Sequence, residues 1–248
     1  MNREATDLAG VRHIAHGTLG STNAEALALA RAGERGPLWI TAKSQSAGRG
    51  RRGSAWVSAP GNLYATLLLT DPSAPAQAPQ VSFVAALALH DAVSECAPQL
   101  GPALSMKWPN DLLLGGKKLA GILIEGDSEK VFAVAVGIGV NCASHPAETS
   151  HPATDLASAG AQVSPERLFA ALVPAVQRRL AQWRRGEGFA GIRADWLKRA
   201  ASLGEDIRVR LPERELSGRF EGLDEAGRLL LRGQGGVTTV TAGEVFGL

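Results

Sequence analysis

Apolar residues recur at helical spacing in one early segment of the chain and form short continuous runs in the segments that follow. From Thr22 to Ala32 alanine and leucine dominate, and Thr22 with Glu25 three residues later has the pattern of a capping box. Gly33 is typical of a residue that ends a helix, so we predict a helix over this segment. Further elements are predicted as a short strand at residues 11–15, buried strands at 37–43 and 62–69, and a buried helix at 80–96.

Four apolar runs follow one another closely in the middle of the chain. Turn residues such as Pro109-Asn110 and Gly115-Gly116 separate them. Tight turns join antiparallel neighbours, whereas parallel strands need a long crossover. The pattern therefore predicts a mixed or antiparallel sheet and not an alternating βαβ array. The runs cover residues 104–108, 112–114, 118–125 and 131–140.

The last third of the chain begins with helices and then changes character. Residues 143–163 have the composition of a loop, and Ser164 followed by proline predicts the start of a helix. Pro174 is expected to kink or break that helix. After Gly204 the chain consists of short alternating runs separated by glycine or proline, which predict about five short strands. The helices are predicted at residues 164–185 and 189–201.

These elements predict an α+β fold in two units. Residues 1–201 are expected to form a mixed central sheet with flanking helices, and residues 202–248 a small C-terminal β-barrel. A unit as small as the second buries too little apolar surface to be stable alone. We therefore expect it to pack on the first.

Composition narrows the classes of function. The chain has 248 residues, of which 45% are hydrophobic and 20% charged, with a formal net charge of +2. Such a balance gives no general attraction to nucleic acid or to a membrane surface. Cys96 and Cys142 show neither a disulfide framework nor zinc spacing, and the histidines show no metal spacing. With no apolar leader and no run of membrane-spanning length, we expect a cytoplasmic protein.

A loop of alternating glycine and arginine, Gly48 to Gly53 (GRGRRG), lies between two predicted strands. Glycine lets backbone N–H groups turn toward an anion, and arginine adds bidentate donors for phosphate or carboxylate. The loop lacks the ending of a Walker P-loop, and a strand follows it instead of the helix of a dinucleotide fold. Trp56 beyond it suits an adenine platform and equally a core position. From the residues alone, an anion-binding loop, a solvated loop and an arginine-rich nucleic-acid contact all remain open.

A second polar cluster starts at Lys107 and continues through Trp-Pro-Asn to Asp111. Asp111 suits a Mg²⁺ that bridges triphosphate oxygens, and Asn110 suits a hydrogen bond to adenine or phosphate. Lys117 and Lys118 begin a buried apolar run, where an unpaired charge is costly. Because strand side chains alternate, only one of these lysines points inward, toward an anion. The alternative is that Asn110 and Asp111 only shape the turn and that both lysines are solvated.

Together these segments resemble the biotin–protein ligase family. GRGRRG and KWPNDL at this separation are very specific as a pair, and each alone is moderately so. The matching motifs lie in order along residues 12–142: Ser21-Thr22-Asn23, Gln45 before GRGRRG, Trp56, GNLY at Gly61 to Tyr64, KWPNDL at Lys107 to Leu112, KKLAGILIE at Lys117 to Glu125 and GIGVN at Gly137 to Asn141.

The resemblance implies an ATP-dependent ligase. Biotin and MgATP would give biotinyl-5′-adenylate and pyrophosphate, and the adenylate would then biotinylate a lysine of a biotin carboxyl carrier protein. Lys118 and Arg51 are the implied catalytic residues, which stabilise charge on the α-phosphorus. The implied biotin-binding residues are Ser21, Thr22, Asn23, Gln45, Arg49, Gly50, Arg51 and Lys118. The implied ATP and adenylate contacts are Arg49, Arg51, Trp56, Asn110, Lys118 and Asn141, with Asp111 for Mg²⁺ and Arg52 turned outward.

Some features depart from the commonest family pattern. Gly20 stands where many members have an aspartate, so a role for that carboxylate is in doubt. Only about twenty residues precede Ser21, which is too few for the DNA-binding domain of repressor members. The resemblance therefore implies a ligase without nucleic-acid binding. The C-terminal unit resembles the SH3-like domain of the family. Members are monomers or homodimers formed through the central sheet, and we expect a homodimer.

Three other functions fit parts of the sequence. Lipoate–protein ligases share the fold and the acyl-transfer logic, but they lack GRGRRG and KWPNDL as written here. The balanced charge disfavours a non-catalytic, arginine-rich nucleic-acid-binding protein. An inactive biotin sensor is disfavoured because Lys118 and Arg51 are both present.

Overall fold

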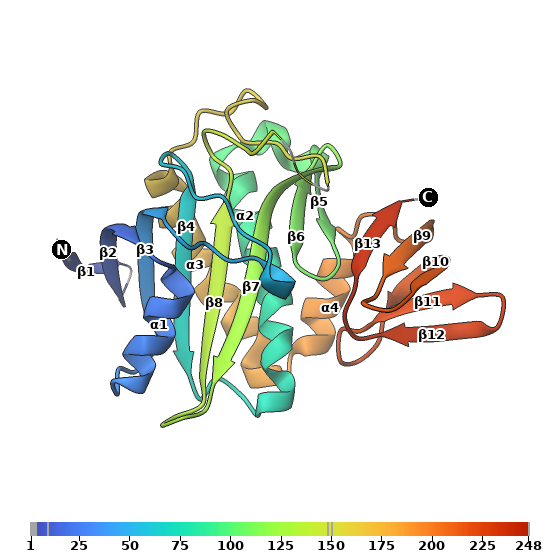
Figure 1. The fold of residues 1–248 in the computed structure, drawn as a ribbon, viewed down its shortest axis with the longest axis horizontal. Coiled ribbons are helices and arrows are strands. Elements are labelled where there is room, and N and C mark those ends of the chain that lie inside the picture. Colours follow the sequence, from blue (N-terminus) through green and yellow to red (C-terminus); the bar gives the residue numbers. More distant parts are fainter. Residues whose placement is uncertain (1–3, 9, 148, 150, 248) are drawn as a thin grey trace.

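An eight-stranded mixed sheet forms the centre of the molecule (Figure 1). The computed structural model describes residues 4–8, 10–147, 149 and 151–247. The strand order is β1-β2-β3-β4-β8-β7-β6-β5, in which β2 and β3 are parallel and the other neighbours antiparallel. The predicted mixed sheet is confirmed, and β1 is a strand that the sequence did not predict. The strands are β1 (Glu4–Leu8), β2 (Val11–Leu19), β3 (Leu38–Gln45), β4 (Leu63–Thr70), β5 (Leu104–Lys107), β6 (Asp111–Leu114), β7 (Lys117–Asp127) and β8 (Ala133–Val140).

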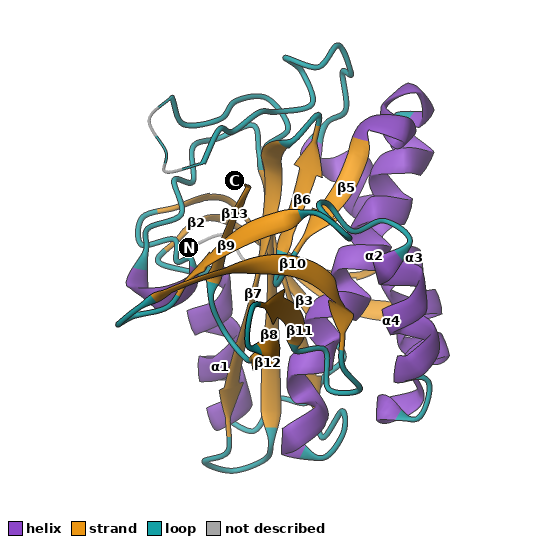
Figure 2. Ribbon diagram, turned by 90° about the vertical axis from the view of Figure 1, so that its right-hand side faces the viewer, coloured by secondary structure: helices purple, strands orange, loops and turns teal. Residues whose placement is uncertain are grey.

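Helices cover both faces of this sheet (Figures 1 and 2). Helix α1 (Thr22–Arg31) lies on one face, and α2 (Val81–Cys96), α3 (Pro165–Trp183) and α4 (Phe189–Leu197) lie on the other. Alternation along β3 serves both sides, because Leu38 and Ile40 pack in the cluster under α1 while Trp39 packs with α2 and α3. The face that carries α1 is only partly covered, and the candidate site occupies the remainder.

Two helix predictions need correction. Ser21, not Thr22, is the N-cap of α1, and its side chain accepts a hydrogen bond from the Ala24 N–H. Both residue types can cap a helix, and the Thr22 hydroxyl makes tertiary contacts instead. Helix α3 runs unbroken past Pro174. The neighbouring Val173 and Ala175 are fully buried, and their packing outweighs the loss of one backbone hydrogen bond.

The C-terminal strands form a separate five-stranded antiparallel sheet in the order β12-β11-β10-β9-β13. It packs beside the β5–β6 end of the large sheet (Figure 1). The Trp108 indole N–H donates to the Gly227 carbonyl at 3.0 Å, and a Cβ on Gly227 would lie 2.7 Å from the Phe83 ring. The expected packing of the small unit on the large one is confirmed. Its strands are β9 (Asp206–Arg210), β10 (Glu215–Leu223), β11 (Leu229–Gly233), β12 (Gly236–Val240) and β13 (Glu244–Gly247). Among the described residues, no helix has the length and apolar character needed to cross a membrane.

Candidate functional site

A cavity of about 680 Å³ opens on the face of the large sheet that carries α1. Five segments surround it: the start of α1, the GRGRRG loop, the turn between β5 and β6, described residues of the loop at 143–153, and the start of β13. The cavity thus brings together segments from nearly the whole length of the chain. Ser21, Thr22, Asn23, Gln45, Arg49, Gly50, Arg51, Trp56, Asn110, Asp111, Lys118 and Asn141 all line it, so every residue that the resemblance implied lies in one place.

Glycines of β7 and β8 form the floor of the cavity. A Cβ on Gly137 would lie 2.4 Å from the Asn23 amide oxygen, and one on Gly139 would lie 2.6 Å from the Trp56 indole. Contacts this short exclude any side chain unless its neighbour moves. The GIGVN motif therefore provides space as well as Asn141, a role that the sequence did not predict.

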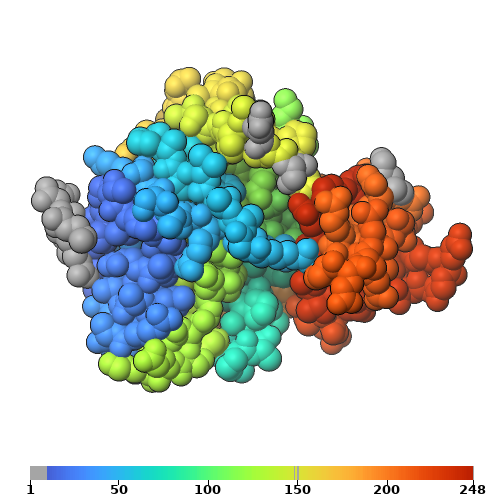
Figure 3. Space-filling view, viewed as in Figure 1, coloured from blue at the N-terminus to red at the C-terminus, as the bar shows by residue number. Residues whose placement is uncertain are grey.

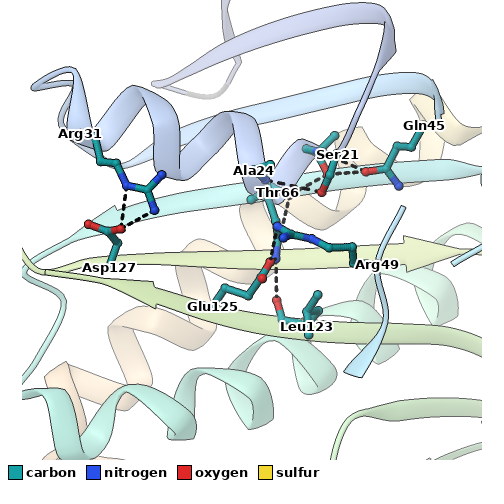
Figure 4. A network of polar contacts seen from close by, with 11 residues as sticks. Ser21, Ala24, Arg31, Gln45, Arg49, Thr66, Leu123, Glu125 and Asp127 are labelled. Carbon is teal, nitrogen blue, oxygen red and sulfur yellow. Dashed lines mark hydrogen bonds and ion pairs between the residues drawn. The ribbon is translucent and has the colours of Figure 1, made fainter. Parts of the chain in front are cut away.

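The first turn of α1 holds a connected set of polar groups at one end of the floor (Figure 4). The Gln45 Oε1 accepts from the Thr22 N–H at 2.9 Å and from the Thr22 hydroxyl at 3.1 Å. The Asn23 amide donates to Glu125 Oε2 at 2.8 Å, while the Thr66 hydroxyl lies 2.7 Å from Asn23 Oδ1. These contacts fix the orientation of each polar group before any ligand arrives.

Glu125 also holds the first arginine of the loop. Arg49 Nη2 lies 3.1 Å from Glu125 Oε2, the oxygen that accepts from Asn23, and Figure 4 shows the Arg49 and Glu125 side chains meeting. Arg49 remains exposed, so solvent weakens this ion pair. No role was predicted for Glu125 or Thr66 from the sequence, although Glu125 is the last residue of the KKLAGILIE motif.

The second arginine connects the loop to the rest of the cavity. Arg51 Nη1 lies 3.3 Å from Asn110 Oδ1 and 3.3 Å from the carbonyl of Gly243 in the C-terminal unit. Burial lowers the pKa of Arg51, with Arg52 next to it acting in the same direction. Arg52 itself is exposed, and its backbone φ is 54°. In the space-filling view the loop crosses the molecule and meets the C-terminal unit (Figure 3).

The Trp56 side chain lies on the glycine floor. Its ring is 3.0 Å from the position of a Cβ on Gly121, and Lys118 Nζ lies 5.5 Å from the ring centroid. The indole N–H finds no acceptor among the described residues although it is buried. Trp56 is thus placed by the absence of side chains beneath it, and its buried N–H lies against Gly139.

Two lysines and one carboxylate form the opposite wall. Asp111 is buried, with Oδ1 2.7 Å from Lys118 Nζ and Oδ2 3.4 Å from Lys107 Nζ. The contact with Lys118 lacks hydrogen-bond alignment, so the ammonium is paired but not tightly fixed. Burial lowers the pKa of Lys107. Lys117 is exposed, and strand alternation thus separates the two lysines as the sequence predicted.

Asn141 supports the rim. Its amide donates to the Thr154 carbonyl at 3.0 Å, and its backbone N–H donates to Leu119 at 3.0 Å. It therefore positions the end of the 143–153 loop and lines the cavity beside Lys118.

His151 joins this loop to the C-terminal unit. Its Nε2 lies 2.9 Å from Glu244 Oε1, and its ring lies 4.5 Å from that of Phe246 between centroids. The side chain is half-buried in this contact, a role for which the sequence had no prediction. Nothing in the sequence could have paired residues 93 positions apart.

This contact predicts a dependence of stability on pH. Burial lowers the pKa of His151 below its ordinary value of 6.5. Below that pH the unfolded chain binds a proton that the folded chain resists, so the free energy of unfolding decreases as pH falls. We expect urea unfolding to show a smaller decrease in His151→Gln than in the native chain from about pH 7.5 to about pH 5.5. The other histidines contribute equally to both proteins, and equal decreases would contradict the assignment.

Comparison with known proteins agrees with this geometry. Residues 21–141 match the Biotin/lipoate A/B protein ligase family, and residues 202–247 match the Biotin protein ligase C terminal domain. The chain is 48% identical over 235 residues to a biotin–[acetyl-CoA-carboxylase] ligase of Paracoccus denitrificans, covering 91% of this chain and 96% of that protein. It is 30% identical over 248 residues to the bifunctional ligase/repressor BirA of Bacillus subtilis, covering 97% and 75%.

Solved structures show the same arrangement. The biotin protein ligase of Aquifex aeolicus in complex with biotin and ATP superposes with a TM-score of 0.80 at 26% identity, over 94% of this chain and 97% of that one. The biotin protein ligase of Leishmania major in complex with biotinyl-5-AMP gives a TM-score of 0.67 at 26% identity, over 93% and 98%.

Proposed function

This chain belongs to the biotin protein ligase family, and from that premise we propose how its cavity carries out the reaction. The protein is an ATP-dependent ligase that activates biotin as biotinyl-5′-adenylate and transfers it to the carboxyl carrier protein of acetyl-CoA carboxylase. The observation that carries the proposed mechanism is the arrangement of Arg49, Arg51 and Lys118 around an uncharged glycine floor. Such a cavity suits a ligand with an apolar end and an anionic middle.

We assign the end of the cavity near α1 to the biotin ring. Ser21, Thr22, Asn23 and Gln45 offer donors and acceptors there that neighbouring residues already orient. A pre-ordered site loses less side-chain entropy on binding, which raises affinity. The glycine floor gives the fused ring a surface without side chains, beside the Trp56 indole that already lies on Gly121 and Gly139.

In the first step the biotin carboxylate attacks the α-phosphorus of ATP. A new carboxyl–phosphorus bond forms, the bond from the α-phosphorus to the bridging oxygen breaks, and pyrophosphate leaves. Lys118 and Arg51 both line the cavity, beside Asp111 and Asn110, and we assign them to stabilise the growing negative charge on this phosphorus. Asp111 pairs with Lys118 at 2.7 Å. We assign Asn110 and Asn141 to the nucleotide.

The residues present also fit a magnesium ion. Asp111 offers a buried carboxylate beside Asn110 at the cavity wall, and no cluster of three or more metal-ligating side chains occurs in the described part of the chain. Mg²⁺ commonly binds one or two carboxylates and completes its shell with phosphates and water. Asp111 would hold the ion, which would neutralise charge on the phosphates.

In the second step the acceptor lysine attacks the biotinyl carbonyl and AMP leaves. Lys118 and Arg51 then stabilise the phosphate of the leaving AMP. We propose the carrier protein, and not nucleic acid, as the macromolecular partner, because the net charge of +2 offers no broad basic surface. The use of ATP supports the cytoplasmic location predicted from the sequence.

We further propose a homodimer formed through the β1 edge of the large sheet. At the other edge, β5 is covered, since Met106 exchanges backbone hydrogen bonds with Arg199 and Ala201. An uncovered edge pairs readily with another strand. Light scattering of the purified chain tests this, and a monomer at all accessible concentrations would contradict it.

Biotin-dependent exchange between ATP and labelled pyrophosphate tests the activation step, with mass spectrometry for biotinyl-5′-adenylate. We expect exchange with biotin and none with lipoate. Exchange with lipoate alone would replace this proposal by a lipoate ligase, and salt-sensitive nucleic-acid binding without adenylate would replace it by a binding protein.

A substitution in the loop tests retention of the adenylate. Arg51→Gly removes the contacts with Asn110 and Gly243 and one cation from the phosphate. Because a charge-assisted hydrogen bond contributes about 1.5–3 kcal/mol, we expect biotinyl-5′-adenylate to dissociate about 10 to 100 times faster. The released adenylate should biotinylate lysines of an added bystander protein, measured by avidin blot. Arg52→Gly is the matched control because Arg52 is exposed, and equal retention in both variants would contradict the role of Arg51.

A further inference from the structure

A second cavity, of about 430 Å³, adjoins the first at the junction between the large sheet and the C-terminal unit. Figure 2 looks onto this junction, where β9 and β10 of the C-terminal unit lie in front of the large sheet. Lys107, Trp108, Lys118, His151 and Val245 line both cavities. These five residues are therefore a shared wall, with the proposed nucleotide site on one side of it.

The second cavity is positively charged. Lys107, Lys118 and Arg208 line it, and the described lining residues include no carboxylate. Asp111 pairs with both lysines but lines only the first cavity. Arg208 is 3.7 Å from Glu215, in a pair whose partners are both exposed and therefore weakly bound. An anion entering here would meet cations on both sides.

The surroundings of Lys107 explain why this cavity would attract an anion. The Lys107 side chain is only 15% exposed, so the ammonium has lost most of its water. Asp111 compensates part of that loss, at 3.4 Å, but it is shared with Lys118. A second anion on the far side of Lys107 would relieve the rest.

The reaction produces an anion that must leave early. Pyrophosphate departs with the electron pair of the broken phosphorus–oxygen bond, while the adenylate has to stay for the second step. The first cavity is bounded by the loop whose Arg51 reaches the C-terminal unit, so leaving by that side would disturb the contacts that retain the adenylate.

We propose that the second cavity binds pyrophosphate and is its route out of the active site. This rests on the proposed ligase function. The wall residues would pass the anion from Lys118 to Lys107 and then to Arg208, which lines the second cavity and not the first.

Pyrophosphate-driven reversal of the first step tests the route. The full chain is loaded with biotinyl-5′-adenylate, and ATP formation is measured against pyrophosphate concentration. For Arg208→Gln we expect the half-saturating concentration to rise about tenfold with an unchanged maximal rate, the loss for one charge-assisted contact. Arg210→Gln is the matched control: it has the same strand face and lies 3.8 Å from Glu215, but Arg210 does not line the cavity. We expect that variant to match the native chain.

Other outcomes overturn the proposal. Identical pyrophosphate dependence in the two variants would show that Arg208 does not contact the anion. A lower maximal rate at unchanged half-saturation would place Arg208 in the chemistry instead. If the native chain forms no adenylate, the ligase function fails separately, and calorimetric titration of the ligand-free chain with pyrophosphate still decides. Binding weakened by Arg208→Gln alone would support the anion cavity, and no difference from Arg210→Gln would reject it.

Discussion

Replacing Lys118 by alanine is expected to slow formation of biotinyl-5′-adenylate by about 100 to 1,000 times, the usual effect of removing one group that stabilises transition-state charge. The ammonium lines the cavity beside Trp56 and is paired with Asp111 without being tightly fixed. It can therefore add a positive charge beside the α-phosphorus as negative charge grows there. In the ground state that charge is smaller, so the Kd of ATP should change by only a few-fold.

Single-turnover kinetics with equilibrium binding of ATP separates the two effects. Lys117→Ala is the matched control, since Lys117 is the preceding residue and its side chain is exposed. We expect that variant to behave like the native chain. Equal losses in rate and in ATP affinity for Lys118→Ala would assign the lysine to simple binding. A loss of fold, which leaving Asp111 with Lys107 alone could cause, is checked by thermal unfolding.

How far the site could be read from the sequence depends on the distance over which each residue acts. Alternation along one strand is a local rule, and it predicted that only one of Lys117 and Lys118 points inward; the resemblance named Lys118, which lines the cavity while Lys117 is exposed. The tight turns likewise predicted the antiparallel pairing of β5 to β8. These statements need only neighbouring residues.

Other features depend on parts of the chain that meet only in the fold. The contact of His151 with Glu244 and that of Arg51 with Gly243 join the catalytic loops to the last strand, and no local pattern marks them. The predicted N-cap of α1 was wrong for a related reason. Ser21 and Thr22 are both good caps, but the Thr22 hydroxyl is hydrogen-bonded to Gln45 and Thr66, and Ser21 caps the helix instead.

The glycine floor shows a third kind of limit. The sequence marked GIGVN as a motif, but a strand glycine has several possible reasons, such as a bulge or a close approach. Only the structure shows that Gly139 lies under Trp56 and Gly137 against Asn23. These glycines matter because they have no side chain, and that can be recognised only when the residues packed against them are known.

The missing side chain at Gly139 is the basis of the second prediction. Gly139→Ala is expected to raise the Kd of biotin by one to two orders of magnitude, because overpacking a filled site costs about 1–3 kcal/mol. The added Cβ would lie 2.6 Å from the Trp56 indole, which belongs to a loop and moves more easily than the sheet. Trp56 should therefore leave the floor while the fold is kept. Biotin on the same floor would then lose both the glycine surface and the neighbouring Trp56 indole.

Isothermal titration with biotin, together with thermal unfolding, measures the two consequences separately. Gly126→Ala on β7 is the matched control, because the nearest atom to its Cβ would be 3.8 Å away, an ordinary contact. It should bind biotin as the native chain does. If Gly139→Ala also binds biotin normally and melts normally, the fused ring of biotin does not lie on the glycines. The polar groups of Asn23 and Gln45 would then have to orient biotin from the side of α1 alone, and Trp56 would be left as a lid over an otherwise empty floor.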